Sequence, residues 1–337
     1  MHNLRIEPFT DNDNESALTL ESQSRQGKSL VLKYRRPTFH ARSKAYHNYK
    51  IFCAKQGNSL VGIIAWAEKY VQLHSKTVRT AYLYDLRVHP EYRNQGIAKK
   101  LVDTVRKDIG HAADCNYTWV TGQNNVTLNL AQNIFNMNFV MPFTYFVIPV
   151  YKKLKLIETY VKITASDAHE NYVANNQGIE FIPEFDDNKL LGYVTSTGEA
   201  KTKNSGCSIW TNENLLAEQV VSIPYHYRIM KSLIAPFRLF AKLPYIPKPN
   251  DILRSWFLFD FFAKDENSLQ SLLTAIKNIA VDHNRHYIYI LLQNNDVLLN
   301  YIKRLKHHLY IFPYFFLASG HSLPAQTDKI YIDIRDL

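Results

Sequence analysis

The sequence predicts an α/β (α+β) fold with a mixed, mostly antiparallel sheet and flanking helices, and it predicts that this arrangement occurs twice. Three observations support this prediction. The chain has 337 residues, enough for two domains of ordinary size. Strand-like runs come first, and strand–helix–strand units follow them. The same order of elements then returns in the second half, together with a repeated Gln-Asn-Asn tripeptide.

The composition is that of a globular protein. Hydrophobic residues make up 46% of the chain and charged residues 21%, which excludes collagen-like and disordered proteins. The best apolar run, residues 139–150, is too short to span a membrane and contains two prolines. The first residues carry no secretion signal and the three cysteines are scattered, so we expect a cytoplasmic protein without a disulfide framework.

Strand-like runs dominate the chain up to Pro90. Residues 4–9 alternate as a strand does, and the polar stretch that follows through Lys44 is expected to be a loop or a marginal helix. Two β runs then flank the turn-forming sequence Gln-Gly-Asn-Ser at 56–59, which predicts a hairpin. A third β run ends at the proline.

Helices and strands alternate through the rest of the first half. Apolar residues recur at helical spacing over residues 97–109, and Gly110 ends this predicted helix. Residues 117–123 predict a strand, residues 126–137 a second helix and residues 139–150 a closing strand. Such a series after antiparallel runs implies a mixed sheet with helices packed on it.

The second half repeats this order after an ambiguous start that reaches about residue 187. Five prolines between residues 224 and 249 predict a long non-helical connection. Two strands are predicted before it, and a strand–helix–strand–helix–strand series after it. The predicted elements cover residues 190–197, 207–211, 255–262, 269–281, 286–293, 297–305 and 310–319.

An internal duplication is our preferred interpretation of this order. Gln-Asn-Asn stands between an apolar strand and a helix at 123–125 and again at 293–295. Asp85 and Asp260 each stand on the strand one unit earlier. The predicted domains are residues 1–150 and 151–337.

The segment DLRVHPEYRNQGIAKKLV, residues 85–102, carries the sharpest chemical signal. A strand runs into a glycine-containing loop that opens a helix, so backbone N–H groups point outward at the positive end of the helix dipole. Gly96 lets the backbone approach a ligand, and Ala98 keeps the start of the helix slim. This arrangement suits a diphosphate. Positive charge is added by Arg93, Lys99 and Lys100.

This segment resembles the signature of the GNAT superfamily of acetyl-CoA-dependent N-acyltransferases, which reads Arg or Gln, two residues, Gly, one residue, then Gly or Ala. Arg93, Gly96 and Ala98 occupy the three defining positions, and the resemblance extends over about residues 51–150. It implies a GNAT-type sheet, acetyl-CoA (coenzyme A) as co-substrate and no metal. The cofactor-binding positions that it implies are Leu86, Arg87, Val88, Arg93, Asn94, Gln95, Gly96, Ile97, Ala98, Lys99, Asn125 and Asn129.

The resemblance also implies roles for parts of this region. In relatives the strand before the loop splays from its neighbour, so backbone groups at 86–88 would hold the pantetheine arm and supply an N–H to the thioester oxygen. The second helix carries an Asn that touches the cofactor, and Asn125 and Asn129 share one helical face. The position of the family's proton-donating Tyr holds Phe135, which cannot donate. The general acid is left open between Tyr145, Tyr84 and water.

A carboxylate is the expected general base, because the amine must lose its proton before it attacks. Asp85 and Glu68 are the candidates, since each stands on a predicted strand beside the expected cleft. The alternative role of Asp85 is structural, for example in a pair with Arg87. The alternative for Glu68 is a solvent-facing position near a strand end.

The net charge of +10 is divided unevenly. Residues 1–150 hold 19 basic and 11 acidic residues, a balance of +8, and the remainder holds 21 and 19, a balance of +2. A half as basic as residues 1–150 attracts nucleic acid, anionic lipid or a phosphorylated small molecule. The loop favours the last, and we do not expect nucleic acid as a partner. After Asp260 the corresponding segment is shorter and lacks glycine, so the second half is expected to be a degenerate copy that does not bind CoA.

The sequence therefore predicts an N-acetyltransferase that moves an acetyl group from acetyl-CoA to a small-molecule or peptide amine by direct attack in a ternary complex. Two alternatives stay open. An aminoacyl-tRNA-dependent transferase of the tandem type would use the basic first half for RNA. A non-catalytic acyl-CoA-binding regulator would account for the missing Tyr. We expect a monomer with pseudo-dimeric halves.

Overall fold

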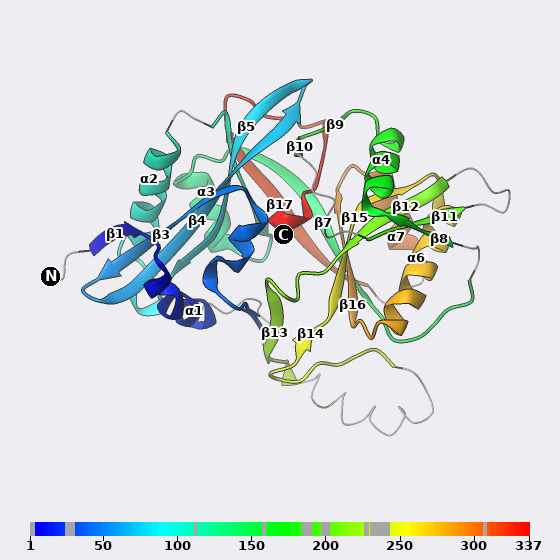
Figure 1. Cartoon of the computed structure of the whole chain (residues 1–337), viewed down its shortest axis with the longest axis horizontal. Coiled ribbons are helices and arrows are strands. Elements are labelled where there is room, and N and C mark those ends of the chain that lie inside the picture. Colours follow the sequence, from blue (N-terminus) through cyan, green and yellow to red (C-terminus); the bar gives the residue numbers. More distant parts are fainter. Residues whose placement is uncertain are drawn as a thin grey trace.

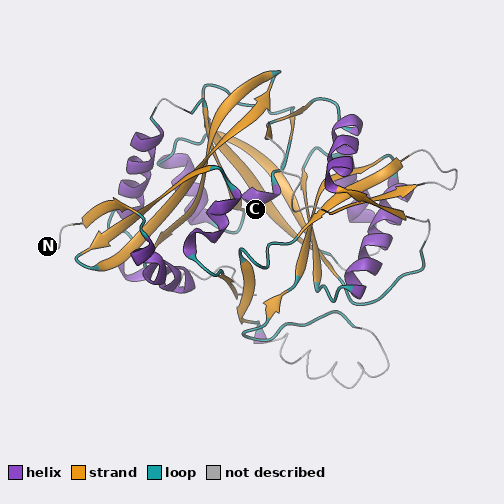
Figure 2. Ribbon diagram, viewed as in Figure 1, coloured by secondary structure: helices purple, strands orange, loops and turns teal. Residues whose placement is uncertain are grey.

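One continuous sheet runs through both halves of the molecule, and helices flank it (Figures 1 and 2). Within the residues described, this sheet has 13 strands. The mixed, mostly antiparallel α/β sheet with flanking helices that the sequence predicts is confirmed. The computed structural model describes residues 4–23, 31–110, 113–156, 160–183, 191–196, 203–225, 229, 243–305 and 309–337.

Each half of the chain contributes six strands to the continuous order of this sheet, and the second half adds one short strand beside it. The first half supplies β1 (Leu4–Pro8), β3 (Asn48–Gln56), β4 (Ser59–Leu73), β5 (Lys76–Val88), β6 (Cys115–Thr121) and β7 (Phe139–Pro149). The second half supplies β8 (Tyr160–Thr164), β11 (Leu191–Ser196), β12 (Lys203–Trp210), β15 (Ser255–Ala263), β16 (Tyr287–Gln293) and β17 (Tyr310–Gly320). The short β10 (Ile182–Pro183) pairs with β4 at the margin of the sheet.

The strand order shows the same arrangement twice. It runs β1-β3-β4-β5-β6-β17-β7-β16-β15-β12-β11-β8, so each half has four antiparallel strands followed by one parallel neighbour. The parallel pairs are β5 with β6 and β15 with β16. The two halves then exchange their closing strands, because β17 lies beside β6 and β7 lies beside β16. The division into domains 1–150 and 151–337 stays a prediction, and the exchanged strands join the two halves in one sheet.

A bulge at the same point of each half supports the duplication. Asp85 in β5 and Asp260 in β15 both have left-handed backbone conformations, with φ of 54° and 47°. At each of them the register with the preceding strand shifts, near Ile64 in β4 and near Cys207 in β12. An extra residue in one strand bends it away from its neighbour. The two aspartates that the sequence pairs are therefore structurally equivalent.

The repeated tripeptide does not occupy equivalent positions. The N–H of Asn124 donates to the carbonyl of Thr121 at the start of one helix, and the N–H of Asp296 donates to that of Gln293 at the start of the other, both at 2.9 Å. Thr121 thus corresponds to Gln293, and the two copies of Gln-Asn-Asn are displaced by two residues. The strand order and the bulges carry the case for duplication, and the tripeptide does not.

Helices cover both faces of the sheet (Figure 2). In the first half, α2 and α3 pack on one face with buried residues such as Leu101 and Val105, while α1 packs on the other through Ala17 and Leu20. In the second half, α6 and α7 share a separate core with β15 and β16. The helices are α1 (Asn14–Gln23), α2 (Ile97–Ile109), α3 (Asn125–Asn133), α4 (Ala165–Asn175), α6 (Glu266–Asp282) and α7 (Val297–Arg304). Among the residues described, no helix has the length and apolar character needed to cross a membrane.

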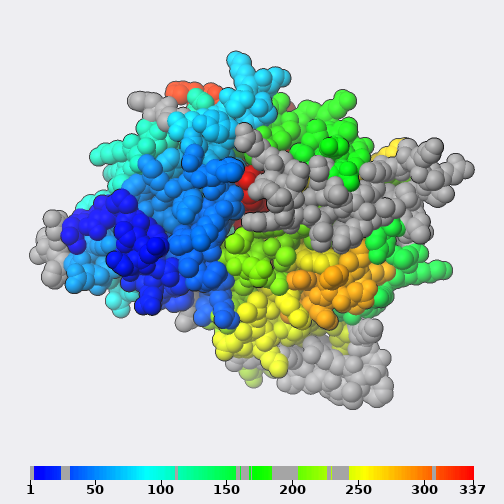
Figure 3. Space-filling model, in the orientation of Figure 1, coloured from blue at the N-terminus to red at the C-terminus, as the bar shows by residue number. Residues whose placement is uncertain are grey.

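Two small sheets tie distant parts of the chain together. β2 (Val31–Arg35) of the first half pairs with β13 (Ala217–Ser222), which also pairs with β14 (Ile252–Leu253). On the face shown in Figure 3, the blue surface of the first half meets the yellow-green surface of the second. β9 (Ile179–Glu180) pairs with β18 (Lys329–Ile330).

The structure corrects two local predictions. The polar stretch through Lys44 contains a full helix, α1, and the strand β2, because this strand obtains its partner from the distant β13. The helix predicted over 126–137 ends at Asn133, and the following Phe135 and Met137 are buried outside it. The prolines between 224 and 249 fall partly outside the described residues.

Candidate active site

A cavity of about 1600 Å³ lies between the two halves of the molecule. One part is lined by β5, by the loop that leads into α2, by β6 and by α3. The other part is lined by β2 and β13, by residues 243–247, and by β7, β16 and β17. The volume exceeds the ~300–1,000 Å³ of an ordinary ligand pocket, so the cavity has room for two substrates.

The N-terminus of α2 opens into this cavity. Gly96 is the N-cap, with φ of 76°, and no side chain caps the helix there. A Cβ on Gly96 would meet no atom within 4 Å, so the glycine is required by its left-handed backbone and not by crowding. Asn94 also has a positive φ, of 62°. The loop therefore presents free N–H groups to an anion. The lining residues here are Arg93, Asn94, Gly96, Ile97, Ala98 and Lys99.

Gln95 does not line the cavity. Its side-chain amide donates to the carbonyl of Glu91 at 3.3 Å, within the turn that precedes α2. Of the residues that the sequence assigns to this loop, the structure brings all the others together at the cavity wall.

β5 and β6 splay apart beside this loop. Their pairing runs only from Thr80 to Tyr82, and beyond it the hydroxyl of Thr118 donates to the carbonyl of Leu83 at 2.8 Å. Residues 86–88 then line the cavity. The edge of β5 that faces β6 is thus open at these residues, as the resemblance implies for a strand that holds pantetheine.

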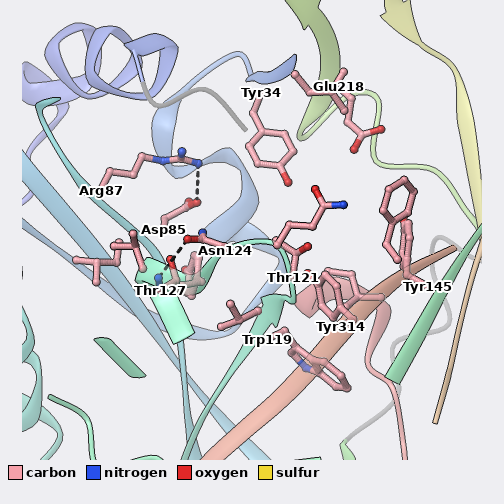
Figure 4. A pocket seen from close by; sticks show the side chains of 18 of the residues that line it. Tyr34, Asp85, Arg87, Trp119, Thr121, Asn124, Thr127, Tyr145, Glu218 and Tyr314 are labelled. Carbon is pink, nitrogen blue, oxygen red and sulfur yellow. Dashed lines mark hydrogen bonds and ion pairs between the residues drawn. The ribbon is translucent and has the colours of Figure 1, made fainter. Parts of the chain in front are cut away.

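Asp85 lies at the cavity wall beside Arg87 (Figure 4), and Arg36 and Arg42 complete a cluster of arginines around it. Its carboxylate is 2.8 Å from Arg36, 3.3 Å from Arg87 and 3.9 Å from Arg42. Burial by itself would raise the pKa of Asp85, but these three charges outweigh it and hold the pKa well below its ordinary value. Arg36 and Arg87 also bind the buried carboxylate of Glu21. Asp85 is therefore a permanent anion that holds the arginines in place, and its geometry does not favour proton acceptance.

Replacing this carboxylate should destabilise the fold. We expect Asp85→Asn to lower the free energy of unfolding at pH 7 by about 3–5 kcal/mol, because it leaves buried arginines without a counter-charge. Asn tolerates the left-handed backbone, so no strain is added. Because its pKa is depressed in the folded state, Asp85 stabilises the protein above the pKa that it has in the unfolded chain. The difference in free energy of unfolding between the unmodified protein and Asp85→Asn should therefore shrink as the pH falls below 3.8. Urea titrations would measure it.

Asp282→Asn is the matched control for that measurement. Asp282 pairs with Lys153 at 2.7 Å on the surface, where both side chains are more than half exposed. The control should cost less than about 1 kcal/mol. An Asp85→Asn protein as stable as this control would contradict the role of Asp85.

Glu68, the other carboxylate that the sequence offers as a base, lies in β4 away from the lining residues. It forms an ion pair with Arg79 and accepts hydrogen bonds of 3.1 Å from Tyr70 and Asn48. The hydrogen bond from Arg79 is the main cause that lowers the pKa of Glu68. The structure thus does not bring Glu68 together with Asp85 at the cavity.

The start of α3 presents different residues to the cavity from those expected. Asn125 and Asn129 are exposed and do not line it, whereas Asn124 and Thr127 do. Asn124 is the N-cap, and its side-chain oxygen accepts from the N–H of Thr127 at 3.1 Å. The structure differs from the expectation because the helix begins one residue earlier than predicted. Phe135 lines the cavity, where it offers an aromatic ring and no proton.

Glu218 is the carboxyl group in the cavity that sequence reasoning missed. It stands on β13 directly opposite Tyr34 of β2, and it accepts a hydrogen bond of 2.8 Å from the hydroxyl of Tyr289. Burial raises the pKa of Glu218, and no basic side chain of the described residues offsets this. The only sequence signal is an acidic residue in a mostly apolar run, and nothing local shows that β2 brings it to this cavity.

Several tyrosines surround Glu218 (Figure 4). Burial raises the pKa values of Tyr34, Tyr145 and Tyr314, and the nearby charge of Glu218 raises them further. Among the described residues, none forms a hydrogen bond with these three hydroxyls. Tyr84, by contrast, donates its hydroxyl to Ser43 at 2.8 Å. Of the two tyrosines considered as general acid, Tyr145 is therefore the one with a hydroxyl available to a ligand.

Between β15 and β16, the described residues of the second half leave much less space. β15 and β16 pair as far as Leu258 and Ile290, but beyond them the remaining cavity measures only about 30 Å³. The chain's own segment 328–332 occupies this place. The N–H of Ile330 donates to the side chain of Gln293 at 3.1 Å, and that side chain donates to the carbonyl of Asp328 at 2.8 Å.

The helix that follows β15 is also closed to an anion. Its N-cap, Asp265, accepts hydrogen bonds of 2.8 Å from the N–H and the hydroxyl of Ser268. The N–H of Ser268 corresponds to one of the N–H groups that stay uncapped at the start of α2, after Gly96. The capping carboxylate and the filled cleft both disfavour CoA binding in the second half. Among the described residues, no group of three or more His, Cys, Asp and Glu side chains could hold a metal ion.

Comparisons with known proteins agree with this geometry. Residues 12–135 match the model of the acetyltransferase (GNAT) family. No curated protein sequence matches the chain. Two structures of N-myristoyltransferase from Saccharomyces cerevisiae, both with bound myristoyl-CoA and one also with inhibitors, are similar with TM-scores of 0.61 and 0.62 at 10% identity. They cover 99% of this chain and are themselves covered to 86% and 87%.

A third similar structure is a conserved protein of unknown function from Enterococcus faecalis, described as a probable N-acyltransferase. Its TM-score is 0.51 at 10% identity, with 96% of this chain and 74% of that chain covered. At such low identity these likenesses establish the fold alone. They extend over both halves, whereas the family match is confined to the first.

Proposed function

Because residues 12–135 of this chain form a domain of the acetyltransferase (GNAT) family, we propose that the protein transfers an acetyl group from acetyl-CoA to an amine. One observation carries the proposal: the open N-terminus of α2 and the carboxyl group of Glu218 line the same cavity. The first suits the diphosphate of CoA, and the second suits removal of a proton from an ammonium group. The volume of about 1600 Å³ supports direct transfer in a ternary complex.

The donor occupies the first half in this proposal. The diphosphate binds the N–H groups at the start of α2, with Arg93 and Lys99 adding positive charge. The pantetheine arm follows the open edge of β5, where a backbone N–H at 86–88 donates to the thioester oxygen. Residues 151–337 supply much of the acceptor side, including Glu218 on β13. The second half is thus a substrate-binding partner and not a second CoA domain.

The chemistry needs three proton transfers. The carboxylate of Glu218 accepts a proton from the bound ammonium, and the neutral nitrogen then attacks the thioester carbon. The negative charge that develops on the oxygen is stabilised by the β5 backbone. When the tetrahedral intermediate collapses, the carbon–sulfur bond breaks and the thiolate takes a proton from Tyr145. The nitrogen of the new amide then loses its second proton, which restores the Tyr145 hydroxyl. The raised pKa of Tyr145 keeps its hydroxyl protonated at neutral pH, so the proton is available.

Tyr145→Phe should lower kcat by about 10²-fold, at the low end of the range for a general acid, because a thiolate leaves readily. Tyr84→Phe is the control, since the hydroxyl of Tyr84 is bound to Ser43, and we expect it to change stability by about 1 kcal/mol and kcat little. Initial rates of thiol release with a fixed amine would measure both. A larger loss of kcat in Tyr84→Phe would reverse the assignment.

The proposed function is tested by thiol release from acetyl-CoA in the presence of a panel of amines, with mass spectrometry of the acetylated product. We expect release that depends on an amine. Binding of acetyl-CoA without turnover on any amine would favour a regulator. A parallel series of longer acyl-CoA donors tests the acetyl group, and faster transfer of a long chain would change the donor but not the reaction class.

A further inference from the structure

The acceptor side of the cavity carries one carboxylate without a basic partner. Of the residues that the structure describes, three with carboxyl side chains line the cavity: Asp85, Asp336 and Glu218. Asp85 is matched by three arginines, and Asp336 by Lys69 at 2.9 Å. Glu218 receives only the hydroxyl of Tyr289, and no basic side chain of the described residues forms an ion pair with it. A ligand with a single positive charge would complete this site.

Aromatic rings enclose that carboxylate. Tyr34 faces Glu218 across the β2–β13 pair, and Tyr289 donates to it. Tyr314 and Tyr145 stack with their ring centroids 5.9 Å apart, and Tyr145 lies 5.4 Å from Tyr289. Figure 4 shows Tyr34, Tyr145, Tyr314 and Glu218 around one space. The faces of such rings attract ammonium groups.

The rest of this side of the cavity is apolar. Between Glu218 and residues 243–247 the wall consists of aliphatic and proline side chains together with Tyr245. They offer an organic cation a surface for its hydrocarbon body and offer a second charge no ionic partner. The aliphatic and proline residues are Ile223, Pro224, Leu243, Pro244, Ile246, Pro247 and Leu253.

From these contacts we infer that the acceptor is a monoamine: one ammonium group on an aromatic or aliphatic body, without a second charge. This inference rests on the proposed function and names its substrate class. The ammonium binds Glu218 among the rings of Tyr34, Tyr289 and Tyr314, and the apolar wall takes the body. A polyamine would bury unmatched positive charges, and an amino acid would bring a carboxylate toward Glu218.

The first test compares acceptors of the full-length protein with acetyl-CoA. We expect 2-phenylethylamine to have a kcat/KM at least about 10-fold above spermidine, phenylalanine and a neutral peptide with a free N-terminus. Turnover of spermidine, phenylalanine or the peptide at an equal or higher rate would overturn the monoamine class and leave the proposed function standing. Absence of turnover with every amine would overturn the proposed function itself.

The second test measures how strongly the positive charge of the ligand contributes to binding, without catalysis. Calorimetry in the presence of CoA compares 2-phenylethylamine with 2-phenylethanol, which has the same body and no charge. We expect the amine to bind about 10-fold or more tightly, and we expect Glu218→Gln to abolish the difference. Equal affinities in the unmodified protein would contradict the inference, whatever the variant does.

The third test concerns the rings. Tyr34→Leu and Tyr314→Leu should each raise KM for 2-phenylethylamine about 5- to 10-fold with a smaller change in kcat, and Tyr34→Phe should keep the KM near its original value. Tyr70→Leu is the control, because Tyr70 lies on β4 with 45% of its surface exposed, outside the lining of the cavity. An unchanged KM in both Leu variants of the cavity would overturn the role of the rings.

Discussion

Glu218→Gln is expected to lower kcat by about 10²–10⁴-fold while the fold stays intact. Gln has the same shape and still accepts the hydrogen bond from Tyr289, but it cannot take a proton from the acceptor amine. The pH profile should change with it. Burial raises the pKa of Glu218, so activity of the unmodified protein should rise with pH through a value above the ordinary 4.5, and this limb should disappear in the variant.

The stability of Glu218→Gln should not fall together with its kcat. A carboxyl group whose pKa is raised in the folded state favours folding below its unfolded pKa, and this contribution is lost as the pH rises through the folded pKa. Above its unfolded pKa the raised pKa of Glu218 therefore lowers the stability of the fold, and Glu218→Gln should melt at the same temperature or higher. A large loss of rate with no loss of stability separates a catalytic role from a structural one.

Glu68→Gln is the informative comparison. Glu68 is the alternative carboxylate on β4, paired with Arg79 outside the cavity lining. We expect Glu68→Gln to keep most of the activity of the unmodified protein. If Glu68→Gln lost activity and Glu218→Gln did not, the assignment of the base would be wrong.

Gly96→Glu is expected to abolish binding of acetyl-CoA. The substitution places a carboxylate at the open N-terminus of α2, where the diphosphate would bind, and the two negative charges repel. The thermal shift that acetyl-CoA gives the unmodified protein should vanish, and no thiol should be released. At 100 times its dissociation constant, a ligand stabilises a fold by about 2.7 kcal/mol, so this loss is easily measured.

Gly178→Glu is a closely matched control. Gly178 has the same φ of 76°, and a Cβ there also meets no atom within 4 Å, so the backbone strain and the added charge are equal. It is exposed at the end of α4 and does not line the cavity. Gly178→Glu should lose stability like Gly96→Glu and still respond to acetyl-CoA. An equal loss of binding in both variants would show that strain, and not the diphosphate site, is responsible.

The features that sequence reasoning located are those encoded locally. The helix at Ile97–Ile109, the glycine before it and the strand before the glycine lie within one short segment, and the structure has them as predicted. The predicted correspondence between Asp85 and Asp260 also agrees with the structure, although the two copies of the tripeptide are out of register.

The features that it missed depend on contacts between distant segments. Glu218 reaches the cavity because β13 pairs with β2, and no local pattern specifies that register. The exchange of β7 and β17 is invisible for the same reason, since both strands carry the same apolar pattern. Asn124 in place of Asn125 reflects a helix start one residue earlier than expected, which is within the ordinary uncertainty of helix ends.

One measurement tests the central claim most directly: a calorimetric titration of the full chain with acetyl-CoA. Although the fold is repeated, of the two equivalent helices α2 has the open N-terminus, because Asp265 caps α6 and residues 328–332 line the small cavity that remains in the second half. The account predicts one acetyl-CoA bound per chain, and none in Gly96→Glu. Two molecules per chain, or none in the unmodified protein, would contradict it.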